Sequence, residues 1–478
     1  MNKEMGFPVF SVEEILRVTG GSLISGRSEQ PFYGLSTDSR SVEKGNLFIP
    51  LKGENYDGHD FIAHALKGGA SGALIQKEEK AKIRRIPEDF RFIAVADTLK
   101  ALGDIAHFWR MKFDVSVIAI TGSSGKTTTK EMIAGIAEMK KNILKTESSL
   151  NNLIGLPKTL LMMNENHNAA VLEMGTNRRG EIARLTEIAA PSIGLITNIG
   201  PAHLEGLKSL DIIQQEKGDL FLIMAGKGTA IINWDDGAVR ILDKRWKGEK
   251  VTFGLTSKAD VSARNIRNGR DGVHFNLIME EHEKEVELPA IGVHNVYNAL
   301  AAAASCRVLG IDQETICQGL SRFHPLAGRM EISRLKNGAF LIDDTYNANP
   351  ASVKEALKTL KDLRKEHKSV AILGDMLELG EQSMDLHEST GMFLADTGVD
   401  MVFLKGGFSQ ATAAGALKGG LSGNQVFVNR TSLEIAACLR SFLKEGDWIL
   451  VKGSRRMKME EIVQDIVNVF GLEKGFLN

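Results

Sequence analysis

One segment constrains the fold more than any other part of the chain, because it joins a buried strand, a glycine-rich loop and a helix. The strand is the run VSVIAI at residues 115–120, which is apolar and β-branched, like strands buried on both faces of a parallel sheet. The loop TGSSGKTTTK follows at 121–130, and EMIAGIAEMKK then has the spacing of a helix. This order predicts an α/β fold with its functional groups at the carboxyl ends of the strands.

The alternation of strands and helices continues on both sides of this segment and predicts three domains. Residues 1–113 form a small α/β domain that begins with a capped helix at 11–20. Residues 114–330 form a central P-loop domain with a parallel sheet. Residues 331–478 form a Rossmann-like, doubly wound domain, with strands at AFLIDD, SVAILGD, MVFLKGG, QVFVNR and DWILVKGS.

Composition excludes several classes of protein. The 59 basic and 60 acidic residues give a formal net charge of -1, which provides no long-range attraction to nucleic acid or to an anionic membrane. No apolar run approaches the ~20 residues that span a bilayer, and the first residues lack the apolar region of a signal peptide. The three cysteines have no metal-ligand spacing, and we expect a reduced, cytoplasmic setting. The 48 glycines exceed the usual share of ~7%.

The loop GSSGKT at 122–127 has the composition of a phosphate-binding loop. Its glycines let successive backbone N–H groups face one anion, and the helix after it adds the positive end of its dipole. We expect Lys126 to reach the β- and γ-phosphates of ATP and Thr127 to ligate Mg²⁺. The general pattern G-x-x-x-x-G-K-[ST] has one more glycine, which would fall at Ile120. A glycine-rich turn with an incidental lysine is the alternative, but the flanking strand and helix favour the phosphate loop.

Three residues beyond the loop are candidates for metal binding and catalysis. Glu173 ends the strand AAVLEMG, where P-loop enzymes place a second acid for Mg²⁺, although a carboxylate at a strand end can also simply face solvent. His203, in GPAHLEG, follows the next strand, and its imidazole can ligate a second metal. A loop histidine bound by backbone groups is the alternative that the residues alone favour. Lys217 lies in the helical stretch QQEKGDLF, which by itself indicates a surface lysine.

Two further patterns suit nucleotide binding. Asn295 and Asn298, in GVHNVYNALAAA, lie three residues apart and hence on one helix face, and carboxamides can read the donor and acceptor edge of a purine. Helix capping and satisfaction of a polar core are the alternative roles. Arg329, in PLAGRMEI, lies at a domain junction, where a guanidinium can clamp a phosphate bidentately or form an interdomain salt bridge.

Eight motifs resemble, in order, those of the Mur ligases of bacterial cell-wall synthesis, and the resemblance covers essentially the whole chain. The shortened loop TGxxGKT is this family's own form, so the missing glycine supports the likeness. The N-terminal STDSRSVEKGNLFIPLKGENYDGHDFI is similar to a uridine-nucleotide domain of the family. The eight motifs are TGSSGKTTTKEM, LEMGTNRRGEI, NIGPAHLEG, GVHNVYNALAA, PLAGRMEI, IDDTYNANP, ILGDMLELG and LVKGSRRMKMEE.

The resemblance implies roles for individual residues toward ATP and metal. The ATP phosphates would be bound by Gly122, Ser123, Ser124, Gly125, Lys126, Thr127 and Thr128. Two Mg²⁺ ions would be held by Thr127, Glu173, His203 and a carbamylated Lys217, which reverses the interpretation of Lys217 as a surface residue. Adenine would contact Asn295 and Asn298, and the third domain would be brought onto the nucleotide by Arg329, Asp344 and Tyr346. Catalysis would fall to Lys126, Glu173, His203, Lys217 and Arg329.

Substrate contacts are implied by the same resemblance. The uridine nucleotide would contact Thr37, Asp38, Ser39 and Arg40. The muramoyl peptide would be held by Asn151 and Asn152. The acceptor site would include Asn347 and Asn349, and the peptide end would lie at Lys452, Ser454 and Arg455. Arg456 adds a charge next to this segment and has no assigned role.

Within the family, IDDTYNANP and LGDMLELG are typical of the enzyme that joins D-alanyl-D-alanine to UDP-N-acetylmuramoyl-tripeptide through an acyl phosphate. The implied products are ADP, phosphate and UDP-N-acetylmuramoyl-pentapeptide for peptidoglycan synthesis, on which cell shape and division depend. One alternative is the preceding ligase, which adds the third amino acid and carries a DNP[RA]-type motif that this sequence lacks. The other is a P-loop regulatory ATPase. Folylpolyglutamate synthases share the loop but lack the N-terminal domain. We expect a monomer that neither binds nucleic acid nor inserts into a membrane.

Overall fold

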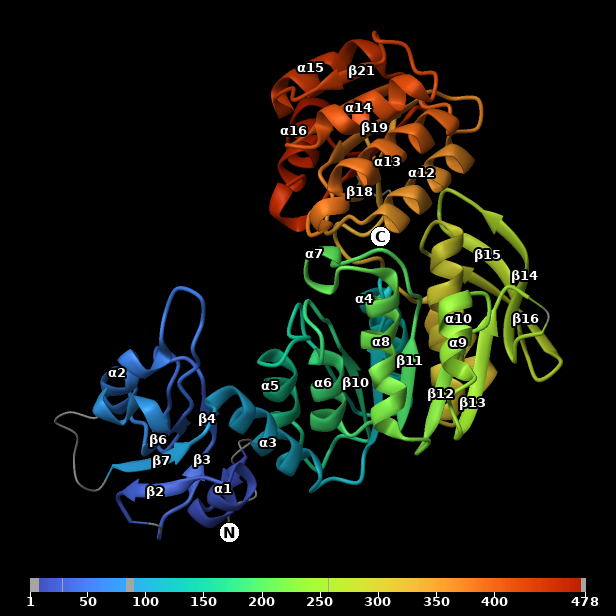
Figure 1. Ribbon diagram of the computed structural model, residues 1–478. Coiled ribbons are helices and arrows are strands. Elements are labelled where there is room, and N and C mark those ends of the chain that lie inside the picture. Colours follow the sequence, from blue (N-terminus) through green and yellow to red (C-terminus); the bar gives the residue numbers. More distant parts are fainter. Residues whose placement is uncertain (1–7, 28, 83–89, 257, 474–478) are drawn as a thin grey trace. The chain divides into compact units, whose positions relative to one another are not determined.

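The computed structural model describes residues 8–27, 29–82, 90–256 and 258–473 (Figure 1). The chain forms two compact units, each built from several stretches of sequence. The first contains Met1–Ala119, Lys141–Gly175 and Glu181–Ser192, and the second contains Ile120–Lys140, Thr176–Gly180 and Ile193–Asn478. The division falls within strand β8 (Ser116–Thr121), just before the glycine loop. The boundaries expected after residues 113 and 330 stay predictions.

A five-stranded sheet organises the N-terminal part of the first unit. Its order is β2-β7-β6-β5-β4, with β2 antiparallel to β7 and the other pairs parallel. The strands are β2 (Ser22–Ser25), β4 (Leu35–Ser36), β5 (Leu47–Phe48), β6 (Gly72–Gln76) and β7 (Arg91–Val95). A short antiparallel pair joins β1 (Val9–Phe10) to β3 (Phe32–Tyr33). The helices are α1 (Val12–Thr19), α2 (Ile62–Lys67) and α3 (Thr98–Arg110).

Helix α1 confirms the capped helix predicted at 11–20. Ser11 Oγ accepts the Glu14 N–H at 3.1 Å, and the Glu14 carboxylate accepts the Ser11 N–H at 3.0 Å, which satisfies two N–H groups that the helix leaves unpaired. Gly20 ends the helix in the left-handed conformation, with φ 62°. The apolar face of α1, including Ile15, packs into a buried cluster with Phe10 and strands of the sheet.

The rest of the first unit adds strands next to β8. Their order is β8-β10-β9, and β9 runs parallel to β10. The elements are β9 (Ile143–Lys145), α5 (Gly155–Leu161), β10 (Ala169–Glu173) and α6 (Glu181–Ala189). All five residues of β10 are buried, as predicted for a strand covered on both faces.

The second unit continues from the end of β8 through β11, β12, β13, β14, β15 and β16. The Thr197 N–H donates to the Thr121 carbonyl at 3.0 Å, which ties the end of β11 to the end of β8. The parallel part confirms the sequence prediction, whereas β14, β15 and β16 form an antiparallel extension that was not predicted from the sequence. The strands are β11 (Ile193–Ile196), β12 (Thr229–Asn233), β13 (Glu249–Gly254), β14 (Val261–Asn268), β15 (Val273–Met279) and β16 (His282–Leu288). The helices are α4 (Lys126–Glu138), α7 (Leu204–Leu207), α8 (Leu210–Met224), α9 (Gly237–Asp243), α10 (Val293–Val308) and α11 (Gln313–Ser321).

A six-stranded sheet in the order β17-β18-β22-β19-β20-β21 forms the C-terminal part of the second unit. Only β17 is antiparallel to its neighbour, and helices α15 and α16 cover one face while α12, α13 and α14 pack together on the other (Figure 1). This is the predicted doubly wound arrangement. The strands are β17 (Glu331–Arg334), β18 (Phe340–Asp344), β19 (Ser369–Gly374), β20 (Met401–Lys405), β21 (Val426–Val428) and β22 (Trp448–Lys452). The helices are α12 (Pro350–Arg364), α13 (Ser383–Asp396), α14 (Ser409–Lys418), α15 (Ser432–Phe442) and α16 (Glu460–Phe470).

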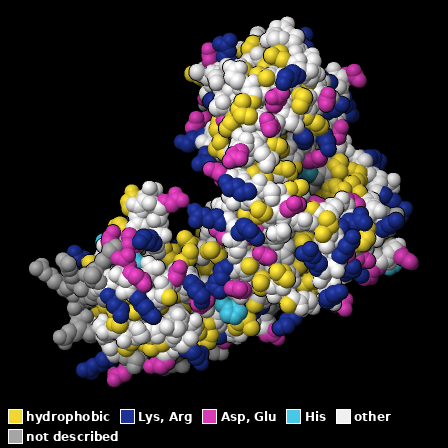
Figure 2. Space-filling model, in the orientation of Figure 1, with side chains coloured by type: hydrophobic (Ala, Val, Ile, Leu, Met, Phe, Trp, Pro, Cys, Tyr) yellow, Lys and Arg dark blue, Asp and Glu magenta, His cyan; other side chains and the backbone are white. Residues whose placement is uncertain are grey.

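Surface charge is mixed, in keeping with the near-zero net charge. Lys and Arg side chains are interspersed with Asp and Glu over the face seen in Figure 2. Of the helices in the described ranges, none has the length and apolar character needed to cross a bilayer.

Candidate active site

The glycine loop occupies its predicted place between β8 and α4. Gly122 and Gly125 have φ angles of 151° and 80°, which other residues rarely adopt. Neighbouring side chains leave no room for a Cβ there either, since it would lie 1.9 Å from Thr197 Oγ1 at Gly122 and 2.3 Å from Asn298 Oδ1 at Gly125. The first turn of α4 holds Lys126, Thr127 and Thr128. The loop thus leads directly into the start of α4, as a phosphate loop requires, and anion binding there stays a prediction.

Residues at the end of β11 hold this loop in shape. Asn198 Oδ1 accepts the Ser124 N–H at 2.9 Å, while the Ser124 carbonyl accepts Thr197 Oγ1–H at 2.6 Å and Asn198 Nδ2–H at 3.1 Å. Ser123 Oγ donates to the Gly200 carbonyl at 2.9 Å. Neither Thr197 nor Asn198 was predicted from the sequence. The available signal was a pair of polar residues directly after an apolar strand, because the carboxyl ends of neighbouring parallel strands share one edge.

Two lysines meet at one acceptor beneath the loop. Lys126 Nζ and Lys217 Nζ donate to the Gly122 carbonyl at 2.8 and 3.0 Å. Lys217 is only 1% exposed, so its interpretation as a surface lysine is wrong. Burial lowers the pKa of Lys217 well below its usual value, and Lys126 lowers it further, while Glu216 acts in the opposite direction. Lys217 is therefore a buried amine that holds its extra proton weakly.

Two residues from beyond position 320 reach the loop and the first turn of α4. Arg329 Nη2 donates to Thr127 Oγ1 at 2.9 Å, and its guanidinium stacks over the Tyr346 ring at 4.0 Å from the centroid. Asn349, which caps α12, donates from Nδ2 to Ser124 Oγ at 3.1 Å. The Arg329 guanidinium therefore lies beside the loop that is predicted to bind phosphate.

Asn295 and Asn298 lie on one face of α10, as their spacing predicts. Both are buried, Asn298 Nδ2 donates to Asn295 Oδ1 at 3.0 Å, and Asn295 Nδ2 donates to the Ile291 carbonyl at 2.8 Å. Thr129 Oγ1 donates to Asn298 Oδ1 at 3.3 Å, which places this pair against α4. These contacts agree with the polar-core role, and contact with adenine stays a prediction.

Asp344 and Lys452 were predicted to serve different ligands, but the structure joins them in one buried ion pair. Lys452 Nζ lies 2.6 Å from Asp344 Oδ2 and donates to the Asn347 carbonyl at 2.9 Å. Each charge therefore compensates the other at the ends of β18 and β22. Arg455 is exposed and pairs with Glu460 at 3.1 Å.

His203 directly precedes α7 and has φ 54°, and its Nδ1 lies 2.7 Å from Glu378 Oε2. The partner of the His203 ring is thus a carboxylate from the motif LGDMLELG, and not the backbone group that the residues alone favoured. This hydrogen bond lowers the pKa of Glu378 against the opposing effect of burial, and Arg456 adds a smaller lowering. Arg456, which had no assigned role, therefore contributes positive charge near this pair.

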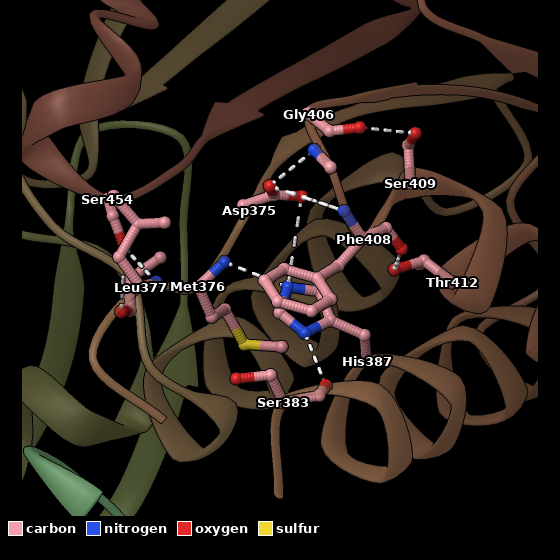
Figure 3. A network of polar contacts seen from close by, with 12 residues as sticks. Asp375, Met376, Leu377, Ser383, His387, Gly406, Phe408, Ser409, Thr412 and Ser454 are labelled. Carbon is pink, nitrogen blue, oxygen red and sulfur yellow. Dashed lines mark hydrogen bonds and ion pairs between the residues drawn. The ribbon is translucent and has the colours of Figure 1, made fainter. Parts of the chain in front are cut away.

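The turn that carries Glu378 begins in a polar network at the ends of β19 and β20 (Figure 3). The Asp375 carboxylate accepts the N–H groups of Gly407 and Phe408 at 2.7 and 3.1 Å, just before α14. A Cβ at Gly406, which has φ 118°, would lie 2.3 Å from the Asp375 carboxyl. These contacts indicate that Asp375 is a structural anchor between two strand ends.

The same network fixes the backbone of the turn. The Met376 N–H donates to His387 Nε2 at 3.0 Å, and the Leu377 N–H donates to Ser454 Oγ at 2.8 Å (Figure 3). His387 Nδ1 lies 2.6 Å from the Ser383 carbonyl, so Nδ1 carries the hydrogen and Nε2 accepts. Burial lowers the pKa of His387, which keeps this neutral form. Ser454, predicted at the peptide end, thus also supports the turn.

Glu173 ends β10 in the first unit and is only 3% exposed, so the solvent-facing alternative is wrong. Its Oε1 accepts Asn151 Nδ2–H at 2.8 Å, while its buried Oε2 has no hydrogen-bond partner. A buried carboxyl oxygen without a donor is a candidate ligand for a cation. Asn152 uses Oδ1 to accept two backbone N–H groups at the start of α5. Nowhere among the described residues do three or more His, Cys, Asp and Glu side chains gather into a metal-binding group.

The four residues predicted for the uridine nucleotide follow β4 in the first unit. The Asp38 carboxylate accepts the Arg40 N–H at 2.9 Å and Arg40 Nη2–H at 2.6 Å. The bond to the Arg40 side chain is the main cause that lowers the pKa of Asp38. Thr37 and Ser39 are half-buried beside this pair. Arg40 is exposed and keeps part of its guanidinium available to an anion.

Three segments of the chain match domains of known proteins. Residues 31–110 match the catalytic domain of the Mur ligase family, residues 120–306 match the Mur ligase middle domain, and residues 328–455 match the glutamate ligase domain of Mur ligases.

Similarity to individual proteins extends over nearly the full length. The chain is 35% identical over 458 residues to UDP-N-acetylmuramoyl-tripeptide–D-alanyl-D-alanine ligase of Bacillus subtilis (strain 168), covering 96% of this chain and 98% of that protein. A crystal structure of MurF from Acinetobacter baumannii superposes with a TM-score of 0.87 at 32% identity, covering 97% and 100% of the two chains. The MurF ligase of Thermotoga maritima in complex with ADP gives a TM-score of 0.81 at 27% identity, covering 91% and 97%.

Proposed function

The chain belongs to the Mur ligase family, and we propose that it joins D-alanyl-D-alanine to UDP-N-acetylmuramoyl-tripeptide in an ATP-dependent reaction. The products are ADP, phosphate and UDP-N-acetylmuramoyl-pentapeptide for peptidoglycan synthesis. Similarity to ligases of this name over nearly the whole chain supports the choice of substrates. The structural observation that carries the proposal is the convergence of Lys126, Lys217 and Arg329 on the glycine loop and the first turn of α4.

Two steps convert the carboxylate into an amide. A carboxylate is a poor electrophile, so one of its oxygens first attacks the γ-phosphorus of ATP, and the bond from that phosphorus to ADP breaks. The dipeptide amine then attacks the carbonyl carbon of the acyl phosphate, phosphate leaves with the bridging oxygen, and the amine releases a proton. Because water would hydrolyse the acyl phosphate, the reaction requires a site from which water is excluded.

The residues at the loop offset the charge repulsion of the first step. A carboxylate that approaches ATP brings negative charges together, and fixed positive groups lower the barrier if they face the transferring phosphoryl group. Lys126 lies on the first turn of α4, and Arg329 contacts Thr127 from a segment about two hundred residues later in the chain. We assign Lys126 to the β- and γ-phosphates and Arg329 to the phosphoryl group.

Each residue assigned to Mg²⁺ has a donor atom of a suitable kind. Glu173 offers a buried oxygen without a donor, and Thr127 offers a hydroxyl at the start of α4. His203 offers its Nε2, since Nδ1 is engaged with Glu378. When bound, Mg²⁺ would supply positive charge that stabilises the phosphates during transfer.

Lys217 has the environment that carbamylation requires. Carbon dioxide reacts with a neutral amine, and burial lowers the pKa of Lys217, which increases the share of that form relative to an exposed lysine. The amine nitrogen bonds to the carbon of CO₂ and loses a proton, which yields an anionic carbamate. Lys126, whose Nζ shares the Gly122 carbonyl, lies close enough to compensate this charge.

Residues of the first unit are assigned to the nucleotide-linked substrate. Asp38 and Arg40 form a rigid polar turn suited to uridine and its diphosphate, and Asn151 is oriented by its bond to Glu173 near the reacting peptide. We place the reaction in the cytoplasm, because it uses ATP and a nucleotide-linked precursor.

Oxygen-18 in the terminal carboxylate of the tripeptide tests the acyl-phosphate route. One labelled oxygen should move to inorganic phosphate and the other should stay in the new amide, because phosphate leaves with the oxygen that attacked ATP. Mass spectrometry of the released phosphate measures this transfer. Unlabelled phosphate accompanied by pentapeptide product would contradict the mechanism.

A further inference from the structure

The geometry points to Glu378 as a positioning residue, whose carboxylate orients the His203 imidazole for metal ligation from a turn 175 residues later in the chain. The inference rests on the proposed role of His203 as a Mg²⁺ ligand. Its consequence is that the metal site depends on contact between α7 and the turn that follows β19.

The hydrogen bond determines which nitrogen of His203 can bind a metal. His203 Nδ1 lies 2.7 Å from Glu378 Oε2, and an ionised carboxylate can only accept a hydrogen bond. Nδ1 therefore carries the hydrogen, and Nε2 keeps the lone pair that a cation requires. The same bond restricts rotation of the ring. Carboxylates act in this way behind many metal-ligating histidines.

The position of Glu378 is itself fixed, because neighbouring backbone groups bind the turn on two sides. The Met376 and Leu377 N–H groups donate to His387 Nε2 and Ser454 Oγ (Figure 3). The Glu378 carbonyl accepts the Glu205 N–H at 2.9 Å, which joins the turn to α7. Glu378 thus contacts the α7 region twice, once through its side chain and once through its backbone.

Close packing and backbone conformation support a specific docking of this turn. Gly380 approaches α7 so closely that a Cβ on it would lie 3.1 Å from Glu205 Cα. His203 and Glu378 both adopt left-handed φ angles, 54° and 65°, which are uncommon for residues other than glycine. Such conformations persist where the surrounding structure determines them, and they are frequent at functional sites.

Manganese binding to the full-length chain in the presence of a non-hydrolysable ATP analogue tests the inference. Electron paramagnetic resonance reports free Mn²⁺, and His203→Ala identifies the site that depends on His203. We expect Glu378→Ala to weaken Mn²⁺ binding at that site by about 10-fold or more. Glu378→Gln keeps an acceptor for Nδ1–H and should weaken binding less. The exposed Glu381→Ala, from the same turn, is the matched control and should bind as the unmodified chain does.

The Mg²⁺ dependence of ligase activity gives a second readout. For Glu378→Ala the half-saturating Mg²⁺ concentration should rise by a similar factor, while kcat recovers at high Mg²⁺, which a merely structural defect would not produce. Unchanged Mn²⁺ affinity in Glu378→Ala, together with loss of the site in His203→Ala, would overturn the role of Glu378 and leave the proposed function intact. Retention of every Mn²⁺ site in His203→Ala would overturn both the metal role of His203 and this inference.

Discussion

At the scale of single residues, Lys126 carries the most direct consequence for catalysis. Lys126 is the first residue of α4, and its ammonium group donates to the Gly122 carbonyl in the loop that we propose binds phosphate. Lys126→Ala should reduce kcat by roughly 10²–10³-fold or more, the loss typical when one preorganised group is removed from a developing negative charge. Steady-state rates of phosphate release measure the effect. Lys140→Ala, an exposed lysine beyond the same helix, should be unchanged, and an active Lys126→Ala enzyme would contradict the phosphate-loop assignment.

A second prediction at this scale concerns Lys217. In the folded chain burial lowers the pKa of Lys217, so more of the neutral amine is available to react with CO₂ than in an exposed lysine. Carbon-13 NMR in labelled bicarbonate should show a carbamate carbonyl signal that Lys217→Met removes. Lys130 is equally buried but lies in an ion pair, with its Nζ 2.7 Å from Glu131 Oε1, so Lys130→Met is the matched control and should keep the signal. A signal that persists in Lys217→Met would contradict the assignment.

Residues within one local motif were predictable, whereas their partners from distant segments were not. The loop and the helix start follow from TGSSGKTTTK alone, because glycine, lysine and threonine have specific tasks at fixed spacing. Lys217 was predicted as a surface residue from local pattern, since nothing in its own helix indicates burial. Asn198 and Glu378 become relevant only through tertiary contacts, which a single sequence does not contain.

At the scale of elements, continuous apolar strands and capped helices were predicted best. Strands such as β10 and β19 are buried on both faces, so their composition identifies them without reference to the rest of the chain. The antiparallel extension β14–β16 was missed because it lacks the continuous apolar runs that identified the other strands, and β16, for example, is the charged segment HEKEVEL. The sequence signal that could have identified this extension is the alternation of residues in β15, whose burial alternates along the strand.

The turn after β19 is expected to be sensitive to acid. His387 has a pKa lowered mainly by burial; the Ser383 carbonyl and Asp375, whose Oδ1 lies 4.0 Å from Nε2, act in the opposite direction. Because the folded pKa lies below the unfolded value of ~6.5, the unfolded turn binds a proton first as pH falls. The stabilisation that neutral His387 gives the turn is therefore complete above pH ~6.5 and is lost as the pH falls toward the folded pKa. The equilibrium constant for folding of the turn falls by at most about tenfold per pH unit.

Hydrogen exchange of the Met376 and Leu377 amides measures this effect. Followed by mass spectrometry and corrected for intrinsic rates, protection of both amides should fall between pH 7.5 and pH 5.5. His387→Phe can keep the stacking on Phe408 but has no acceptor for Met376, so its protection should be low at both pH values. Equal protection of the unmodified chain at both pH values would show that His387 does not control the turn.

At the scale of the whole molecule, the glycine content has two separate uses. Gly122 and Gly125 shape the loop after β8, where neither the backbone conformation nor the space allows a side chain. Gly391 and Gly415 instead let α13 and α14 pack closely, because a Cβ on either would lie about 2 Å from a backbone carbonyl oxygen of the facing helix. The near-zero net charge likewise conceals local positive charge, since Lys126 and Arg329 both lie at the first turn of α4. Composition indicated a surplus of glycine and a balance of charge, but not where either is used.

Phosphate release under defined substrate combinations tests the central claim most directly. With ATP and Mg²⁺, the enzyme should release phosphate rapidly only when UDP-N-acetylmuramoyl-tripeptide and D-alanyl-D-alanine are both present, with one phosphate for each pentapeptide formed. Omission of either peptide substrate should reduce release to background. Rapid release with the corresponding dipeptide nucleotide and a free diamino acid would instead identify the ligase that adds the third amino acid. Rapid release from ATP alone would identify a regulatory ATPase, and either result would contradict the proposed function.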